Sequence, residues 1–220
     1  MSKIVALTKI FSNILMIGAV VLFLCAFGPV FFDELSYVAT RAWNSGWQLN
    51  DSIDRKNVPN TLENVITRKP LSLRPVNTES SIVIEKIGVS APIVVNVDVT
   101  SPKEYKDALK LGVAHAKGSA LPGSPGNTYL FAHSSINFWE LGKYATVFNL
   151  LGKLEMGDKI VLFYRSKRFD YEVIDKKIVA GFNTLPLLRK TTIPVLTLQT
   201  CDPPGTTLNR LIVTARILSD

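Results

Sequence analysis

Apolar residues are distributed in two different ways along this chain. From residue 14 to residue 32 they form one unbroken run without a charged side chain. At about 1.5 Å per residue, a helix over such a run is long enough to cross the hydrocarbon core of a bilayer. From about residue 80 to residue 220, short apolar runs alternate with glycine, proline and polar residues. The pattern predicts an N-terminal membrane-spanning helix followed by a β-rich globular domain.

The charges on either side of the apolar run predict its orientation. Lys3 and Lys9 precede the run, and Asp33 and Glu34 follow it. Lysine excess marks the cytoplasmic side of a membrane, so we expect a cytoplasmic N-terminus and an extracytoplasmic domain at the plasma membrane. The helix would then contact membrane lipid. A cleaved signal peptide and a buried core helix are the alternatives, although this run is longer than a signal core and lacks a clear cleavage site.

Composition divides the chain into four parts. We expect a cytoplasmic tail over 1–9, a transmembrane signal-anchor helix over 10–32, an extracytoplasmic spacer over 33–79 and a globular domain over 80–220. The spacer begins with a possible short helix, on which Trp43 and Trp47 lie one turn apart. Such a pair suits a membrane interface or ordinary contacts with the domain. The polar, proline-containing remainder is typical of a linker.

The domain is predicted to be mainly β. Short apolar or alternating runs predict strands at 81–87, 91–97, 128–132, 159–164, 169–179, 194–200 and 211–217, and two short helices are expected at 102–111 and 146–154. The 118–126 segment between them is rich in turn residues. Seven or eight short strands with two brief helices indicate an antiparallel barrel or sandwich.

The strand over 194–200 leads directly to a cysteine. Leu196 and Leu198 lie on one face of this strand, whereas Gln199 and Cys201 lie on the other, more polar face. The only other cysteine, Cys25, lies in the N-terminal apolar run, so Cys201 has no disulfide partner within the domain. An unpaired thiol where a strand meets a loop is a candidate nucleophile.

A nucleophilic thiol usually needs a base or a positive charge nearby. His133 directly follows the strand predicted over 128–132, and Arg210 opens the last strand. On these features alone, His133 is equally explained as a structural histidine, and an arginine in the position of Arg210 is more often a solvated strand end than a substrate-binding group. The second histidine, His115, is expected in a loop. One cysteine and two separated histidines do not have the spacing of a zinc site, and we expect neither a metal nor a cofactor.

The chain is basic, with a formal net charge of +7. A nucleic-acid-binding domain would gather its Lys and Arg residues on one helix or one face. Here the positive charges are spread thinly along the sequence. We therefore expect no nucleic-acid partner.

Several ordered sequence blocks resemble the sortase family. Thr-Leu-Gln-Thr-Cys over 197–201, followed by Arg-Leu-Ile-Val over 210–213, is similar to the family's signature strand pair. The 84–93 segment resembles the family's opening strands. The next block of the family is similar to residues 112–123, which begin Gly-Val-Ala-His and end Leu-Pro-Gly. The strand that carries the family's histidine is similar to residues 126–133, which begin Gly-Asn and end Ala-His. The resemblance covers about residues 80–220.

The resemblance implies a cysteine transpeptidase on a closed antiparallel β-barrel. Cys201 would attack a C-terminal sorting motif of the Leu-Pro-x-Thr-Gly type in surface proteins and form a thioester. An amine of a cell wall precursor or of another protein subunit would then take the acyl group. His133 would protonate the leaving amine and later deprotonate the incoming one, and Arg210 would stabilise the oxyanion. Thr200 and Ala132, next to these residues in sequence, are expected to contact substrate.

Two further residues bear on this interpretation. His115 matches a variable histidine of the family, which we interpret as structural. Asp202 directly follows the nucleophile, and its negative charge disfavours the thiolate unless its side chain points away. Two alternatives stay open: a thiol endopeptidase that hydrolyses the thioester, and an inactive, membrane-anchored binding module.

Overall fold

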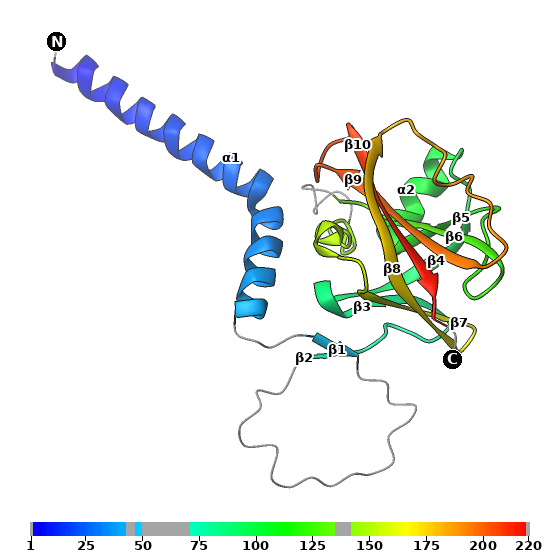
Figure 1. The fold of residues 1–220 in the computed structure, drawn as a ribbon. Helices are drawn as coiled ribbons and strands as arrows, with labels where there is room; N and C mark the ends of the chain where they lie inside the picture. The colour runs from blue at the N-terminus through cyan, green and yellow to red at the C-terminus, as the bar shows by residue number, and fades with distance from the viewer. Residues whose placement is uncertain (1, 43–46, 50–70, 135–141, 219–220) are drawn as a thin grey trace, which may run out of the picture.

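The main body of the protein is a β-barrel, and a long N-terminal helix leads to it (Figure 1). The computed structural model describes residues 2–42, 47–49, 71–134 and 142–218. Trp43 of the predicted spacer therefore lies outside the described residues, as does most of the polar linker. Trp47 opens a short strand, β1 (Trp47–Leu49), which pairs in parallel with β2 (Leu71–Leu73).

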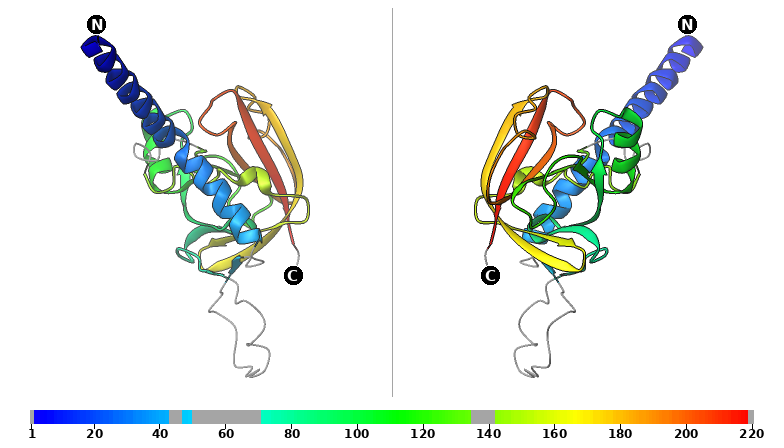
Figure 2. Two further views of the ribbon diagram at one scale, coloured as in Figure 1. Left: turned by 90° about the vertical axis from the view of Figure 1, so that its left-hand side faces the viewer. Right: turned by 90° about the vertical axis from the view of Figure 1, so that its right-hand side faces the viewer.

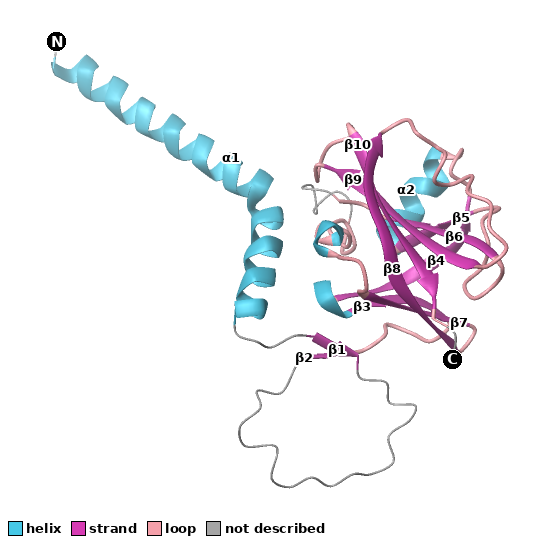
Figure 3. Cartoon of the chain, in the orientation of Figure 1, coloured by secondary structure: helices cyan, strands magenta, loops and turns pink. Residues whose placement is uncertain are grey.

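Eight strands close the barrel (Figure 3). They are β3 (Ser80–Ile84), β4 (Val89–Val97), β5 (Val113–Ala116), β6 (Gly126–Phe131), β7 (Lys159–Tyr164), β8 (Lys167–Ala180), β9 (Pro194–Asp202) and β10 (Asn209–Ile217). Around the barrel the order is β10-β8-β7-β3-β4-β5-β6-β9, and β9 pairs with β10 to complete the ring. The prediction of a mainly β closed barrel with few helices is confirmed.

The prediction of a purely antiparallel barrel is wrong. β4 pairs with β5 in parallel, and β6 pairs with β9 in parallel. A parallel pair needs a long crossover connection, which a pattern of short strands does not reveal. The first crossover contains a helix, and the second contains the β7–β8 hairpin. The second crossover is the one that matters for function, because it places β6 beside β9.

Helix α2 (Pro102–Leu111) forms over the residues predicted for it. Ser101 caps the helix by accepting a hydrogen bond from the Glu104 N–H, and Pro102 occupies the first turn, where its missing N–H costs nothing. Its own residues Ala108 and Leu109 are buried. The helix predicted over 146–154 is instead a series of turns that ends in a short 3₁₀ helix, η3 (Leu151–Lys153).

Alternation along the strands places leucine and valine side chains inside the barrel. Leu130 of β6, Leu196 and Leu198 of β9 and Val213 of β10 are fully buried in one core cluster. Successive side chains of a strand point to opposite faces, so the intervening residues of β6 and β9 lie on the outer face. There Phe131 stacks against Tyr105 of α2, with ring centroids 5.2 Å apart.

Helix α1 (Ser2–Ala42) covers the predicted anchor and continues into the predicted spacer. The helical conformation over 10–32 is confirmed. Within the residues that the structure describes, however, no helix combines the length and the apolar character needed to cross a membrane. The membrane-spanning anchor predicted over 10–32 is not supported by this finding.

The second half of α1 lies beside the barrel, while its first half projects away (Figure 2). Asn149 donates a hydrogen bond to the Asp33 carboxylate at 2.9 Å, and Lys153 forms an ion pair with Glu34. The Lys153 ammonium group also lies 5.6 Å from the centre of the Tyr37 ring. Burial raises the pKa of Asp33, and the Asn149 hydrogen bond opposes that rise. These contacts join α1 to the segment around η3.

Gly123 gives a stability test of the barrel's outer layer. It has a φ of +78°, and a Cβ atom here would lie 2.1 Å from Cε1 of Phe169 on β8. We expect Gly123→Ala to lower the free energy of unfolding by about 3 kcal/mol, because left-handed backbone strain adds to overpacking against a ring. Urea unfolding followed by circular dichroism measures the change.

Gly118→Ala is the matched control. Gly118 has a similar φ of +85°, but no atom lies within 4 Å of the position of an added Cβ. This variant should lose only the backbone contribution, about 1 kcal/mol. Equal losses in the two variants would contradict the close packing of Gly123 against Phe169.

Candidate active site

Three neighbouring strands bring the candidate residues to one end of the barrel. Arg210 of β10 lies directly opposite Cys201 of β9 in an antiparallel pair. On the other side of β9, Phe131 of β6 pairs with Gln199 in a parallel pair. His133 follows Phe131 by two residues, as Cys201 follows Gln199, so the two lie level on adjacent chains. Neighbouring strands are about 4.8 Å apart, so Arg210 and Cys201 are direct neighbours, and the extrapolated β6–β9 register puts the His133 backbone next to that of Cys201.

Cys201 lies on the outer face of β9, as the alternation predicted, and its side chain is half-buried. Burial raises the pKa of the Cys201 thiol, and the positive charge of Arg210 partly opposes that rise. Asp202, the next residue of the same strand, points to the opposite face by alternation. By this alternation its carboxylate is expected on the side away from the sulfur, where its charge disfavours the thiolate least.

His133 is half-buried at the end of β6, and burial lowers the pKa of its imidazole. Its Nε2 atom is buried and has no hydrogen-bond partner in the described part of the chain. Its backbone carbonyl accepts a hydrogen bond from the Phe148 N–H at 3.3 Å. A buried ring nitrogen without a partner is costly, and it fits a group that exchanges a proton with a substrate.

Arg210 is fixed by its own neighbourhood. Its Nη1 atom donates to the backbone carbonyls of Thr207 at 3.2 Å and Asn209 at 3.0 Å. Among the described residues no carboxylate forms an ion pair with it. The turn before it is tied to the histidine loop, because the Gly205 N–H donates to the Ser134 carbonyl at 2.6 Å. The guanidinium charge is thus held beside Cys201 and is available to an anionic group.

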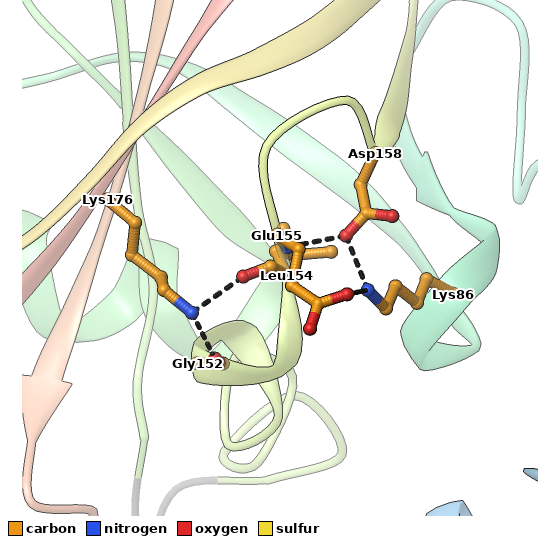
Figure 4. A network of polar contacts seen from close by, with 6 residues as sticks. All are labelled: Lys86, Gly152, Leu154, Glu155, Asp158 and Lys176. Atoms are coloured by element: carbon orange, nitrogen blue, oxygen red, sulfur yellow. Dashed lines mark hydrogen bonds and ion pairs between the residues drawn. The ribbon is translucent and has the colours of Figure 1, made fainter.

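A network of polar contacts fixes the chain segment that runs from η3 to β7 (Figure 4). The Lys86 ammonium contacts the carboxylates of Glu155 at 2.6 Å and Asp158 at 2.8 Å. Lys176 donates to the backbone carbonyls of Gly152 at 2.8 Å and Leu154 at 2.7 Å. These bonds hold the end of the segment that contacts the His133 backbone.

Thr200 and Ala132 contact each other. The Thr200 hydroxyl donates to the Ala132 carbonyl at 3.0 Å, and both residues are buried. They lie on the strand face opposite to Cys201 and join β6 to β9 beyond the end of the regular ladder. The structure thus places them behind the candidate site, where they set the register, and not on its open side.

The other histidine is occupied elsewhere. His115 belongs to β5 and not to the expected loop, and it is 1% exposed. Its Nδ1 atom accepts from the Asn96 N–H at 3.2 Å, and its Nε2 atom lies 3.0 Å from the Ala120 carbonyl. Burial lowers its pKa, which keeps the ring neutral. This arrangement suits a residue that supports the turn-rich segment after β5.

Sequence reasoning missed two tyrosines near the site. Burial raises the pKa of Tyr105, and the charges of Cys201 and Arg210 also act on it. Burial raises the pKa of Tyr129 as well, where Arg210 opposes the rise. Tyr129 has the same strand parity as His133, a signal that was present in the sequence. Tyr105 gave no such signal, because only the packing of α2 brings it to the site.

Comparison with known proteins shows the family to which this chain is related. The family model described as "Sortase domain" matches residues 82–218. Sortase D of Bacillus subtilis (strain 168) is 31% identical over 134 residues, which cover 60% of this chain and 59% of that protein. The chain thus spans about three fifths of the length of this relative.

Solved sortase structures are similar over the same region. Sortase C-1 of Actinomyces oris is 31% identical, with a TM-score of 0.54 over 66% of this chain and 76% of that one. The Sortase D5 transpeptidase of Clostridium perfringens is 25% identical, with a TM-score of 0.52 over 65% of this chain and 80% of that one. With a family match over more than half of its length, this chain belongs to the sortase family.

Proposed function

We propose that this protein is a cysteine transpeptidase that acts at the cell surface. It cleaves a C-terminal sorting motif of the Leu-Pro-x-Thr-Gly type and transfers the acyl fragment to an amine of a cell wall precursor or of another protein subunit. The observation that supports the proposal is the strand register, which pairs Arg210 with Cys201 and ends the neighbouring β6 two residues before His133.

The resting site holds its nucleophile in the neutral form. Burial disfavours charge on both groups: it raises the pKa of Cys201 and lowers the pKa of His133. Near neutral pH the pair is therefore a thiol and an uncharged imidazole. Such an imidazole can accept the thiol proton when a peptide carbonyl is in place, so the reactive thiolate forms only with substrate bound.

The first half-reaction follows from these positions. The Cys201 sulfur attacks the scissile carbonyl as its proton passes to His133, and the carbonyl oxygen becomes an oxyanion. The fixed Arg210 guanidinium stabilises this negative charge. Collapse of the intermediate breaks the C–N bond, His133 gives its proton to the leaving amine, and a thioester remains on Cys201.

The second half-reaction reverses the roles. An incoming amine attacks the thioester carbonyl, and His133 accepts the proton that the amine loses. The sulfur departs and is reprotonated, so the enzyme returns to its neutral resting pair. Water in place of the amine would make the protein a thiol endopeptidase, and the two outcomes differ only in the second nucleophile.

Mass spectrometry with a library of sorting-motif peptides tests the proposal. We expect an acyl adduct on Cys201 that hydroxylamine releases, and we expect a ligated product to replace the hydrolysed acid when a peptide with a free N-terminus is added. Cys201→Ala should form no adduct. Arg210→Ala should acylate about 100-fold more slowly, since a lost oxyanion donor typically costs that much.

Two results would count against the proposal. Hydrolysed acid as the only product at every amine concentration would make the protein an endopeptidase. If Cys201→Ala restored the function of a cell lacking this protein as well as the wild type does, and neither protein formed an adduct, the protein would be a binding module instead of an enzyme.

The pH dependence of thiol alkylation tests the electrostatics of the site. Only the thiolate reacts with iodoacetamide, so the rate follows the ionised fraction of Cys201. Because its pKa is raised, the rate should keep rising beyond the pH at which a model-peptide cysteine levels off. Removing a positive charge that lowers the pKa must raise it further, so Arg210→Ala should move the midpoint to still higher pH.

Two matched variants sharpen this measurement. Arg210→Lys keeps the charge and should move the midpoint less than Arg210→Ala. His133→Ala should leave the midpoint nearly unchanged, since an imidazole with a lowered pKa carries no charge where the thiol ionises. A large upward movement in His133→Ala would reveal an ion pair in the resting site and contradict the neutral pair.

A further inference from the structure

A glutamine and a tyrosine lie on the same outer face as the proposed nucleophile. Gln199 precedes Cys201 by two residues on β9, and Tyr129 lies on the neighbouring β6. The Tyr129 hydroxyl donates a hydrogen bond to the Gln199 side-chain carbonyl. The side chain of Gln199 lies beside Phe131, its partner in the β6–β9 register.

This hydrogen bond orients the Gln199 carboxamide. Its oxygen is held by Tyr129, so its NH₂ group must point away from that hydroxyl. The NH₂ group donates to no acceptor in the described part of the chain, and Gln199 is only half-buried. Tyr129 is 4% exposed, and burial raises its pKa, so its hydroxyl stays protonated as a donor. A donor is thus held in place without a partner of its own.

The spacing suits an extended peptide. Two residues along a strand cover about 6.6 Å, and an extended substrate repeats over the same distance. When a scissile carbonyl lies at Cys201, a carbonyl two residues away in the peptide lies near Gln199. A hydrogen bond between a side-chain amide and a peptide carbonyl is a usual way to fix the position of a substrate.

The acyl side of the peptide is the side expected at Gln199. Beyond Cys201 in the other direction, β9 ends at Asp202, and a turn follows. Towards the start of β9, other parts of the protein pack beside the strand. The Asn127 side chain donates to the Pro186 carbonyl at 3.1 Å and accepts a hydrogen bond from the Thr197 hydroxyl of β9 at 2.7 Å. The acyl fragment must stay bound through both half-reactions, whereas the leaving amine must depart.

An aromatic wall completes the surroundings. Tyr105 of α2 stacks on Phe131 with an angle of 10° between the rings, and this pair flanks Gln199. Tyr105 is also close enough to Cys201 and Arg210 to interact with their charges. A substrate residue bound at Gln199 would therefore rest its side chain against an aromatic surface.

We propose that Gln199, oriented by Tyr129, is a substrate-positioning residue whose NH₂ group donates to the backbone carbonyl of the sorting peptide two residues before the scissile one. This inference rests on the proposed function. The pair binds the acyl fragment equally in the ground state and the transition state, so it acts on substrate affinity and not on the chemical step.

Three variants and one altered peptide test the inference. Gln199→Met keeps the length of the side chain but removes the amide, and Tyr129→Phe removes only the hydroxyl that orients it. Each should raise KM for a Leu-Pro-x-Thr-Gly peptide by about tenfold, the usual scale for one hydrogen bond, with kcat changed little. The double variant should be no worse than Gln199→Met alone, because both changes remove the same interaction.

The altered peptide carries an alkene in place of the amide that contains the proposed carbonyl. With the wild type, kcat/KM for this peptide should be about tenfold lower than for the unaltered peptide. With Gln199→Met, the two peptides should give nearly the same kcat/KM. Tyr171→Phe is the matched control: it removes a buried hydroxyl that accepts from the Gly123 N–H, away from the site. This variant should lower stability without changing KM.

The outcomes separate the inference from the proposed function. If the wild type is acylated but KM is the same in Gln199→Met, or if the altered peptide loses equally with both enzymes, the inference is overturned. If no peptide acylates the wild type, the proposed function fails and the inference fails with it. Unchanged alkylation of Cys201 by iodoacetamide in the variants would show that the thiol itself is intact.

Discussion

The hydrogen-bond register between β6, β9 and β10 is the constraint on which the site depends. His133 and Arg210 are far from each other in sequence, and β9 lies between the strands that carry them. A shift of one residue in either ladder would turn a side chain to the opposite face. The Thr200–Ala132 hydrogen bond, at the end of the parallel ladder, holds that register where the site begins.

Burial then determines the chemistry that the aligned groups can perform. Partial burial raises the pKa of the thiol and lowers that of the imidazole, so both are uncharged at rest. The positive charge of Arg210 lies close enough to lower the pKa of the thiol, and in the proposed mechanism it would stabilise the oxyanion of the transition state. Under the proposed function this arrangement would be an advantage, because the nucleophile would be unreactive without a substrate.

Much of this site could be predicted because its signals are local. Alternation along 194–201 placed Cys201 on the outer face, and the position of His133 after an apolar strand marked it as supported by a rigid element. The parallel pairing of β6 with β9 could not be predicted, since it depends on a crossover that encloses a whole hairpin. For the same reason α2 gave no sign that Tyr105 would reach the site, although its helical bounds were predicted correctly.

The support behind His133 shows which forces decide its position. The segment that contacts its backbone includes Phe148, Leu151 and Leu154, all fully buried, and each contributes about 2 kcal/mol by burial. The ion pair from Glu34 of α1 reaches the same segment but is partly exposed, and such pairs contribute at most about 1 kcal/mol.

Core packing therefore outweighs the helix contact in fixing this segment. At the far end of the segment, Lys86 binds two carboxylates and Lys176 binds two backbone carbonyls, and these polar contacts orient the chain there. The barrel itself thus supplies the scaffold of the histidine loop, and α1 adds a contact at its edge. The geometry of the site is consequently a property of the sortase domain, set by its own core and strand register.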